Sequence, residues 1–191
     1  METSTADDPS SASVTDLLKD WPKGEPVPAI SIRQPWAAAV VWLGKDIENR
    51  NHWIYKYRGP LIIHASASKF SADDLIEMLA IARKDGVPEE ELDLFNPDGY
   101  VTDLLAQGAI VGVAKLTAVF GKDDELPTDE LVADSPWGED TCEHWLHLTE
   151  ATPCEPAPFK GRVGLFKVPY EIAMSLRPFD WGLRTEKDNS N

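Results

Sequence analysis

The segment GKDIENR, residues 44–50, brings a lysine, a glutamate and an arginine together directly after an apolar run. If the segment forms a strand, Glu48 and Arg50 project from one face, Ile47 points to the core, and Lys45 follows a glycine turn. An arginine fork and a lysine can hold phosphate or base acceptors, and a carboxylate can accept from the exocyclic amine of a base. The motif therefore predicts a polar site for a nucleotide-like ligand.

Aromatic and basic side chains elsewhere in the chain could complete such a site. Tryptophans offer the flat faces on which unpaired bases stack. Lysine and arginine flank Gly161 in a turn, where they could contact a phosphate. The predicted ligand-binding residues are Gln34, Trp36, Lys45, Glu48, Arg50, Trp53, His64 and Lys160.

The same charges also have a purely structural interpretation. Glu48 and Arg50 can form an ion pair that closes the fold while Trp36 and Trp53 belong to the core, because structural pairs are commoner than functional ones. His64 follows an apolar run, where a histidine is typically a hydrogen-bonded internal residue. Both interpretations stay open at this point.

No metal and no cofactor is predicted. Cys142, His144, His147 and Cys154 form the only candidate quartet. The two histidines fall on opposite faces of a predicted strand, and the cysteines lack the close spacing of zinc ligands. Two cysteines are also too few for a disulfide framework.

The formal charge of −15 disfavours long duplex DNA as a partner, because nucleic acid backbones are bound through Lys and Arg. Residues 29–60, however, carry a net charge of +3. An acidic body around a small basic site predicts single-stranded RNA, a nucleotide or a modified nucleoside as partner. The sequence does not indicate an oligomeric state.

The sequence predicts a cytoplasmic protein that does not enter membranes. No apolar stretch approaches the roughly 20 residues of a membrane helix. The beginning METSTADDPSSAS lacks the basic and then apolar pattern of an export signal.

Periodicity and turn residues predict one α+β domain built on a small curled sheet. Predicted strands cover residues 29–32, 46–50, 59–65, 109–120, 143–148 and 164–168. Predicted helices cover 37–43, about 72–85 and 100–107, with an acidic loop at 121–135 and a proline-rich turn region at 153–158. The predicted domain is 29–175, between a tail of residues 1–28 and a tail of residues 176–191.

Several ordered blocks resemble the ASCH domain, the activating-signal-cointegrator homology domain. SIRQPWAAAVVWLGKDIENRNHWIYKYRGPLIIHAS at 31–66 is similar to its opening, in which a QPW turn precedes Gly-x-Lys-x-x-Glu-x-Arg; here Gly44 adjoins the lysine instead of standing two positions before it. GAIVGVAKL at 108–116 and PFKGRVGLFKVP at 158–169 resemble the later strands. The likeness covers about residues 30–169.

The resemblance implies a PUA-like β-barrel of about six strands with two or three flanking helices, and binding of RNA, DNA or modified bases. One bacterial branch of the family hydrolyses an acylated cytidine with a lysine, a threonine three positions later and a distant glutamate. Lys45 matches that lysine, whereas Glu48 stands at the threonine position. Two alternatives to binding therefore remain: a hydrolase or ribonuclease with Lys45 and Glu48 as catalytic residues, and a protein-interaction module.

Overall fold

Six strands in the described part of the chain form a single mixed sheet. The computed structural model describes residues 13–95, 104–122, 132 and 134–180. The strands are β1 (Val27–Ile32), β2 (Ile47–Arg50), β3 (Gly59–Ala65), β4 (Ala109–Gly121), β5 (His144–Pro158) and β6 (Leu165–Val168). Their order is β2-β5-β4-β3-β1-β6, with β1 and β3 parallel and all other neighbours antiparallel. The predicted α+β class is confirmed, and the sheet curls like a barrel without pairing its edge strands β2 and β6.

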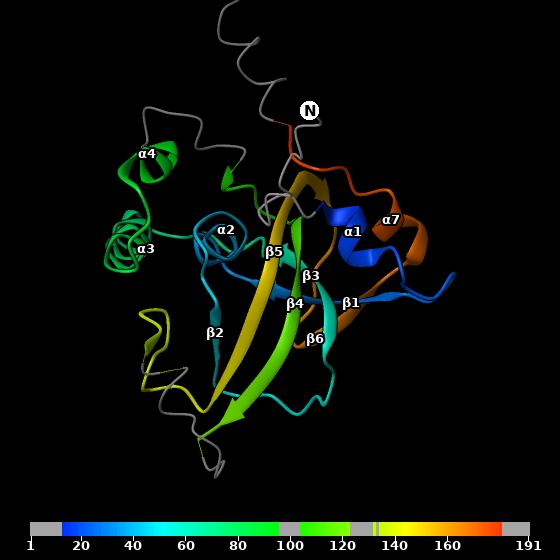
Figure 1. The fold of residues 1–191 in the computed structure, drawn as a ribbon, viewed down its shortest axis with the longest axis horizontal. Coiled ribbons are helices and arrows are strands. Elements are labelled where there is room, and N and C mark those ends of the chain that lie inside the picture. The colour runs from blue at the N-terminus through cyan, green and yellow to red at the C-terminus, as the bar shows by residue number, and fades with distance from the viewer. Residues whose placement is uncertain (1–12, 96–103, 123–131, 133, 181–191) are drawn as a thin grey trace, which may run out of the picture.

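Helices cover both faces of this sheet (Figure 1). One face packs against α1 (Val14–Leu18) and α7 (Tyr170–Met174), and α2 (Trp36–Trp42) lies on the other. A further layer, α3 (Ala72–Lys84) and α4 (Glu89–Leu92) with a short 3₁₀ turn η2 (Asp93–Phe95), packs on the far side of α2.

The helix α2 is enclosed between two apolar layers. Ala37, Val40 and Val41 pack on the sheet, while Ala38 and Ala39 face α3 and its neighbours. A helix that is apolar on every side is stable only when it is buried all round. This position fixes the two ends of α2, which carry the QPW turn and Gly44.

The helix α3 begins at a capping box, in which Ser71 and Asp74 satisfy each other's backbone amides. The hydrogen bonds from Ser71, backbone first, hold the pKa of Asp74 below its usual value. The Asp74 carboxylate also accepts from Arg33 at 2.7 Å. The start of α3 is thereby tied to the loop that follows β1.

The predicted strands and the helices 37–43 and 72–85 are confirmed, with bounds that shift by a few residues except at the end of β5, which extends to Pro158 instead of residue 148. The proline-rich turn region at 153–158 is wrong, because these residues continue β5. They pair with β4 on one side, while β2 covers only His144–His147 on the other. Proline is tolerated where a strand has no regular neighbour to receive its missing N–H.

The folded unit also includes residues on both sides of the predicted 29–175 boundaries. Val14 and Leu18 of α1 are 1% exposed and pack under the sheet. Beyond residue 175, Leu176 is buried, Pro178 bridges to Cys154 of β5, and Phe179 contacts Trp42 edge-on.

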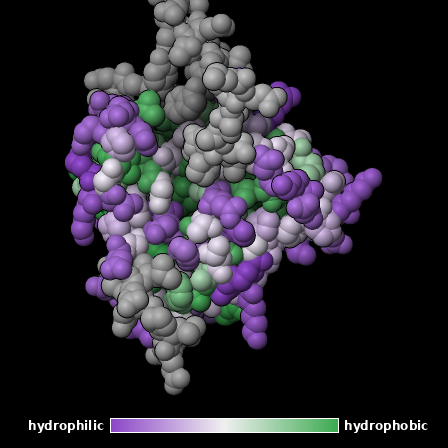
Figure 2. Space-filling view, viewed as in Figure 1, coloured by the Kyte–Doolittle hydropathy of each residue, from purple (hydrophilic) through white to green (hydrophobic). Residues whose placement is uncertain are grey.

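Half of the predicted helix at 100–107 and most of the acidic loop at 121–135 lie outside the described residues, and in the described half of that predicted helix only Leu104 is helical. Leu104 and Leu105 are described and buried. None of the helices in the described ranges combines the length and apolar character needed to span a bilayer. Hydrophilic side chains dominate the face shown in Figure 2, with apolar ones surfacing in scattered areas between them.

Candidate ligand-binding site

The predicted charged cluster forms where α2 turns into the edge strand β2. Gly44 ends the helix with a φ of 69°, a backbone conformation that glycine adopts without strain. The turn allows the Lys45 amide to donate to the Ala39 carbonyl at 3.1 Å. It also directs the Lys45 side chain toward Glu48, which lies on β2.

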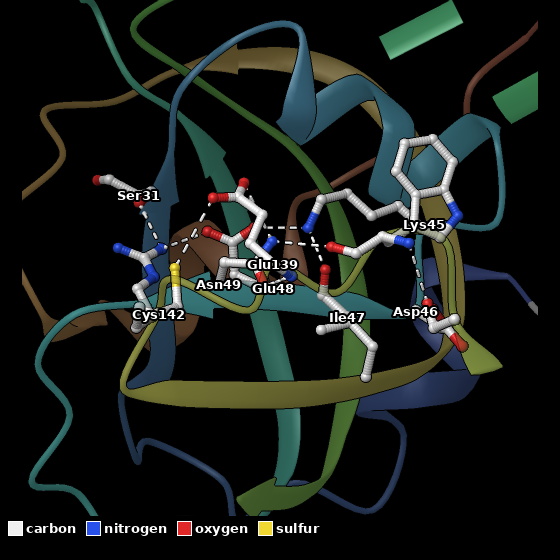
Figure 3. A network of polar contacts seen from close by, with 11 residues as sticks. Ser31, Lys45, Asp46, Ile47, Glu48, Asn49, Glu139 and Cys142 are labelled. Carbon is white, nitrogen blue, oxygen red and sulfur yellow. Dashed lines mark hydrogen bonds and ion pairs between the residues drawn. The ribbon is translucent and has the colours of Figure 1, made fainter. Parts of the chain in front are cut away.

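The three charged side chains form one continuous chain of contacts, of which Figure 3 labels Lys45 and Glu48. Lys45 Nζ donates to the Ile47 carbonyl and, at 2.9 Å, to Glu48 Oε2. Arg50 Nη2 lies 3.1 Å from Glu48 Oε1 and donates to the Ser31 carbonyl at 2.9 Å. The cluster therefore ties β2 to β1 across the open side of the sheet.

Burial differs sharply within this chain. The side chains of Lys45 and Glu48 are 3% and 9% exposed, whereas that of Arg50 is 23% exposed. A buried charge is tolerated only when it is paired, and each member of the buried pair has the other as partner. Arg50 is the member that remains accessible.

The cluster lines a cavity of about 260 Å³, called here the paired cavity. Apolar side chains and three residues of each charge sign surround it. The apolar lining is Ile32, Trp36, Ile81, Pro136 and Trp137; the charged lining is Arg33, Lys45, Arg50, Glu48, Glu77 and Glu139; Ser31 and Asn49 complete it. The described lining is thus formally neutral, and of its two indoles Trp36 is half-buried whereas Trp137 is buried.

The wall opposite β2 is held in place by hydrogen bonds from the motif. Asn49 donates to the Trp137 carbonyl at 2.8 Å and accepts from the Glu139 amide at 3.0 Å. Ser135 donates to Asp46 at 2.6 Å. Segment 135–139 is therefore fixed at both ends against residues 46–49.

A second cavity of about 440 Å³, called here the basic cavity, adjoins the first, and Ser31 and Arg50 line both. It contains two further predicted site residues, His64 and Lys160. The other residues around it are Ser66, Ala67, Gly108, Phe159, Gly161, Arg162, Val163 and Gly164.

Two predicted site residues lie elsewhere. Gln34 is fully buried, accepts from the Ala38 amide at 3.0 Å and donates to the Ala106 carbonyl at 2.8 Å, so it caps the first turn of α2. Trp53 is 6% exposed, packs in the core and donates to the Tyr55 carbonyl. Neither lines the two cavities, whereas Trp36, Lys45, Glu48, Arg50, His64 and Lys160 do.

Several lining residues were missed by the sequence reasoning. Asn49 lies inside the motif. Its only signal in the sequence was strand alternation, which places it on the face opposite to Glu48. Glu77 and Ile81 are four residues apart on α3, a spacing that places them on one helical face. Trp137 follows the acidic loop, and nothing local indicates that it reaches β2.

The cysteines are unsuited to act as nucleophiles. Burial raises the pKa of the Cys154 thiol to about 12, and burial together with nearby Glu139 raises that of Cys142. Thiols rather than thiolates therefore predominate near neutral pH. Within the described ranges, no three His, Cys, Asp or Glu side chains gather as metal ligands.

Comparisons with known proteins give a distant structural likeness. The chain is similar to the crystal structure of ASCH from Zymomonas mobilis, with a TM-score of 0.45 and 13% identity over 81% of this chain and 99% of that one. A tyrosine-to-phenylalanine mutant of the same bacterial protein gives a TM-score of 0.45 and 13% identity over 80% and 99%. No family model and no curated protein matches the chain.

Proposed function

We propose that the protein is an ASCH-type domain that binds a nucleotide or a short single-stranded RNA, with one base in the paired cavity. The observation that carries the proposal is the contact chain from Lys45 through Glu48 to Arg50 at the wall of an aromatic-lined cavity. Cation, carboxylate and indole are the three kinds of group with which proteins bind unpaired bases.

Each group has a role that its chemistry defines. Glu48 accepts from the exocyclic amine of a base, and Arg50 donates to a ring or carbonyl acceptor beside it. Lys45 is held by Ile47 and Glu48 and orients the carboxylate from behind. Trp36 supplies the stacking face.

Size and charge support a base over a phosphate at this position. The volume of about 260 Å³ lies just below the range of about 300–1,000 Å³ typical of small-molecule sites, so it suits a single base. Three cationic and three anionic side chains cancel formally around it. A doubly charged phosphate would gain little from such a neutral lining.

The protein-interaction alternative has its own observation, because the Lys45–Glu48 pair is buried and mutually satisfied. On that view the motif stabilises the fold and the cavity binds nothing. The two proposals differ in what a substitution changes: ligand affinity in one case, and stability alone in the other.

The test is a calorimetric titration of the four nucleosides, acylated cytidine and short RNAs into the wild-type protein, with chromatographic product analysis. Glu48→Gln and Arg50→Lys should each lower base affinity about tenfold or more, since a charged hydrogen bond contributes about 1.5–3 kcal/mol. Glu150→Gln is the matched control, because Glu150 is paired with Lys115 at the exposed surface.

Two results would decide against binding as the function, and a third would decide against this site. No heat with any nucleoside or RNA would reject the proposal in favour of a structural motif. Product formation by the wild type that is lost in a Lys45→Met variant shown to be folded would identify a hydrolase instead. Equal affinities in the wild type and both motif variants would show that the base binds outside the paired cavity.

A further inference from the structure

We propose that the basic cavity binds the phosphate of the same ligand, so that the preferred ligand is a phosphorylated nucleoside or a phosphodiester and not a free nucleoside. The inference rests on the proposed function of the paired cavity and deepens it. The two cavities share Ser31 and Arg50, so they lie side by side, and the phosphate of a ligand whose base occupies the first would lie next to the second.

The charge of the basic cavity is the first support. Arg50, Lys160 and Arg162 line it, and none of its described lining residues is a carboxylate. Lys160 and Arg162 are exposed, and neither forms an ion pair with the described part of the chain. In a protein of formal charge −15, two cations without a carboxylate partner among the described residues, beside a third, Arg50, favour a small anion.

Two buried polar atoms at the walls are the second support. Arg50 Nε and Ser66 Oγ are both buried and lack a hydrogen-bond partner among the described residues. Both residues line the basic cavity. A phosphate has several acceptor oxygens, so a phosphate in the basic cavity would bring acceptors close to donors that lack them.

The loop that carries the cations is held firmly by the sheet beneath it. The Phe159 amide donates to the Gly108 carbonyl at 3.0 Å, and its carbonyl lies 2.9 Å from His64 Nε2. A carbonyl can only accept, so Nε2 carries a proton, and in the neutral ring Nδ1 accepts from the Ser31 hydroxyl at 3.1 Å. His64 is thus a clamp between β1, β3 and the loop.

Gly161 is the point where the loop approaches this clamp most closely. A methyl group at that position would lie 2.5 Å from both His64 Nδ1 and Ser31 Oγ. Only glycine allows the backbone to pass there, with Lys160 and Arg162 on either side. The cations therefore extend from a rigid base, which lowers the ordering cost of binding an anion.

The experiment compares nucleosides, their 3′- and 5′-monophosphates, dinucleotides and inorganic phosphate by calorimetry on the full chain. In the wild type, a monophosphate or dinucleotide should bind about tenfold or more tightly than its nucleoside. The double variant Lys160→Gln/Arg162→Gln should lose that difference while keeping nucleoside affinity. Lys167→Gln, an exposed lysine on β6 outside both cavities, should change neither.

Each outcome distinguishes the phosphate site from the base site. Equal affinity for nucleoside and phosphorylated forms in the wild type overturns the phosphate site but leaves the base site intact. A phosphate preference that persists in the double variant places the anion elsewhere. Failure of every nucleoside and nucleotide to bind rejects the proposed function itself. Thermal unfolding of the double variant verifies that it is folded, and the two single variants show how much each cation contributes.

Discussion

The two adjoining cavities share Ser31 and Arg50 but use charge in opposite ways. In the paired cavity, Lys45 is buried against Glu48, and the lining is formally neutral. In the basic cavity, Lys160 extends into solvent from a loop, with no carboxylate among the described lining residues. Substitutions of Lys45 and of Lys160 are therefore expected to differ in their effects on stability and on ligand affinity.

The difference teaches that burial decides what a charge contributes. A buried ion must be paired, so its removal leaves an uncompensated partner and changes stability. Removing an exposed cation changes the free energy of unfolding little, and its contribution appears in the affinity for an anion. Arg50 lies between these limits, since it is partly exposed and lines both cavities.

The largest expected effect is on stability, from Lys45→Met. The substitution keeps the aliphatic stem but leaves Glu48 with only Arg50 as partner, so the free energy of unfolding should fall by about 3 kcal/mol. Lys160→Met should change it by less than about 0.5 kcal/mol, because Lys160 is exposed. Urea unfolding followed by tryptophan fluorescence measures both values.

A double variant sharpens this result. Lys45→Met/Glu48→Gln removes the uncompensated carboxylate and should recover part of the lost stability. If Lys45→Met alone proved as stable as the wild type, the pair would not be buried in solution, and the contrast between the cavities would disappear.

A smaller loss is expected from Gly161→Ala. The added methyl group meets His64 and Ser31, so the loop must shift, at a cost of about 1–3 kcal/mol of stability. The preference for phosphorylated ligands should fall with it, since Lys160 and Arg162 move with the backbone. Lys167→Gln on β6 is the control, because Lys167 is exposed and lies outside both cavities, so it should affect neither quantity.

An unchanged unfolding free energy for Gly161→Ala would show that the loop is loose and the clamp is not effective. Retained stability together with a lost phosphate preference would still assign the anion to this loop.

The sequence was sufficient for the six strands in outline, for α2 and α3 and for the cluster, but not for α4, α7 and the second half of β5 or for the surroundings of the cluster. Lys45, Glu48 and Arg50 are close in the chain, and strand alternation places Glu48 and Arg50 on one face, so local rules predict that they meet. Trp36 was accessible to the same reasoning, because Pro35 and the apolar run after it mark the start of a helix.

What could not be predicted depends on contacts between distant segments. Trp53 and Trp36 look equivalent as sequence, yet only the packing of the 53–57 loop on the sheet makes Trp53 internal. Gln34 resembles a ligand residue until α2 and Ala106 supply its partners. The continuation of β5 through three prolines likewise depends on a distant segment, because β2 pairs with only the first residues of β5.

Substitutions of Trp36 and Trp53 should have effects of intermediate size on two different quantities. Trp36→Leu should weaken nucleoside binding by about 1–2 kcal/mol, the contribution of one base stacked on an aromatic ring. Trp53→Leu should leave nucleoside affinity unchanged and lower the free energy of unfolding by about 2 kcal/mol, since its ring is in the core. Calorimetric titration and urea unfolding of both variants separate the two roles. Weaker nucleoside binding in a fully folded Trp53→Leu variant would contradict the assignment.

The smallest expected effect comes from salt alone. Nucleoside affinity should change less than about twofold between about 0.05 M and 0.5 M salt, because the paired cavity is formally neutral and screening acts equally on both signs. The additional affinity of a monophosphate should decrease several-fold over the same range, because it depends on exposed cations such as Lys160 and Arg162. Parallel titrations of one nucleoside and its monophosphate provide the measurement. A nucleoside affinity as salt-dependent as that of its monophosphate would mean that the base and the phosphate do not occupy separate electrostatic environments, and the division between the two cavities would have to be abandoned.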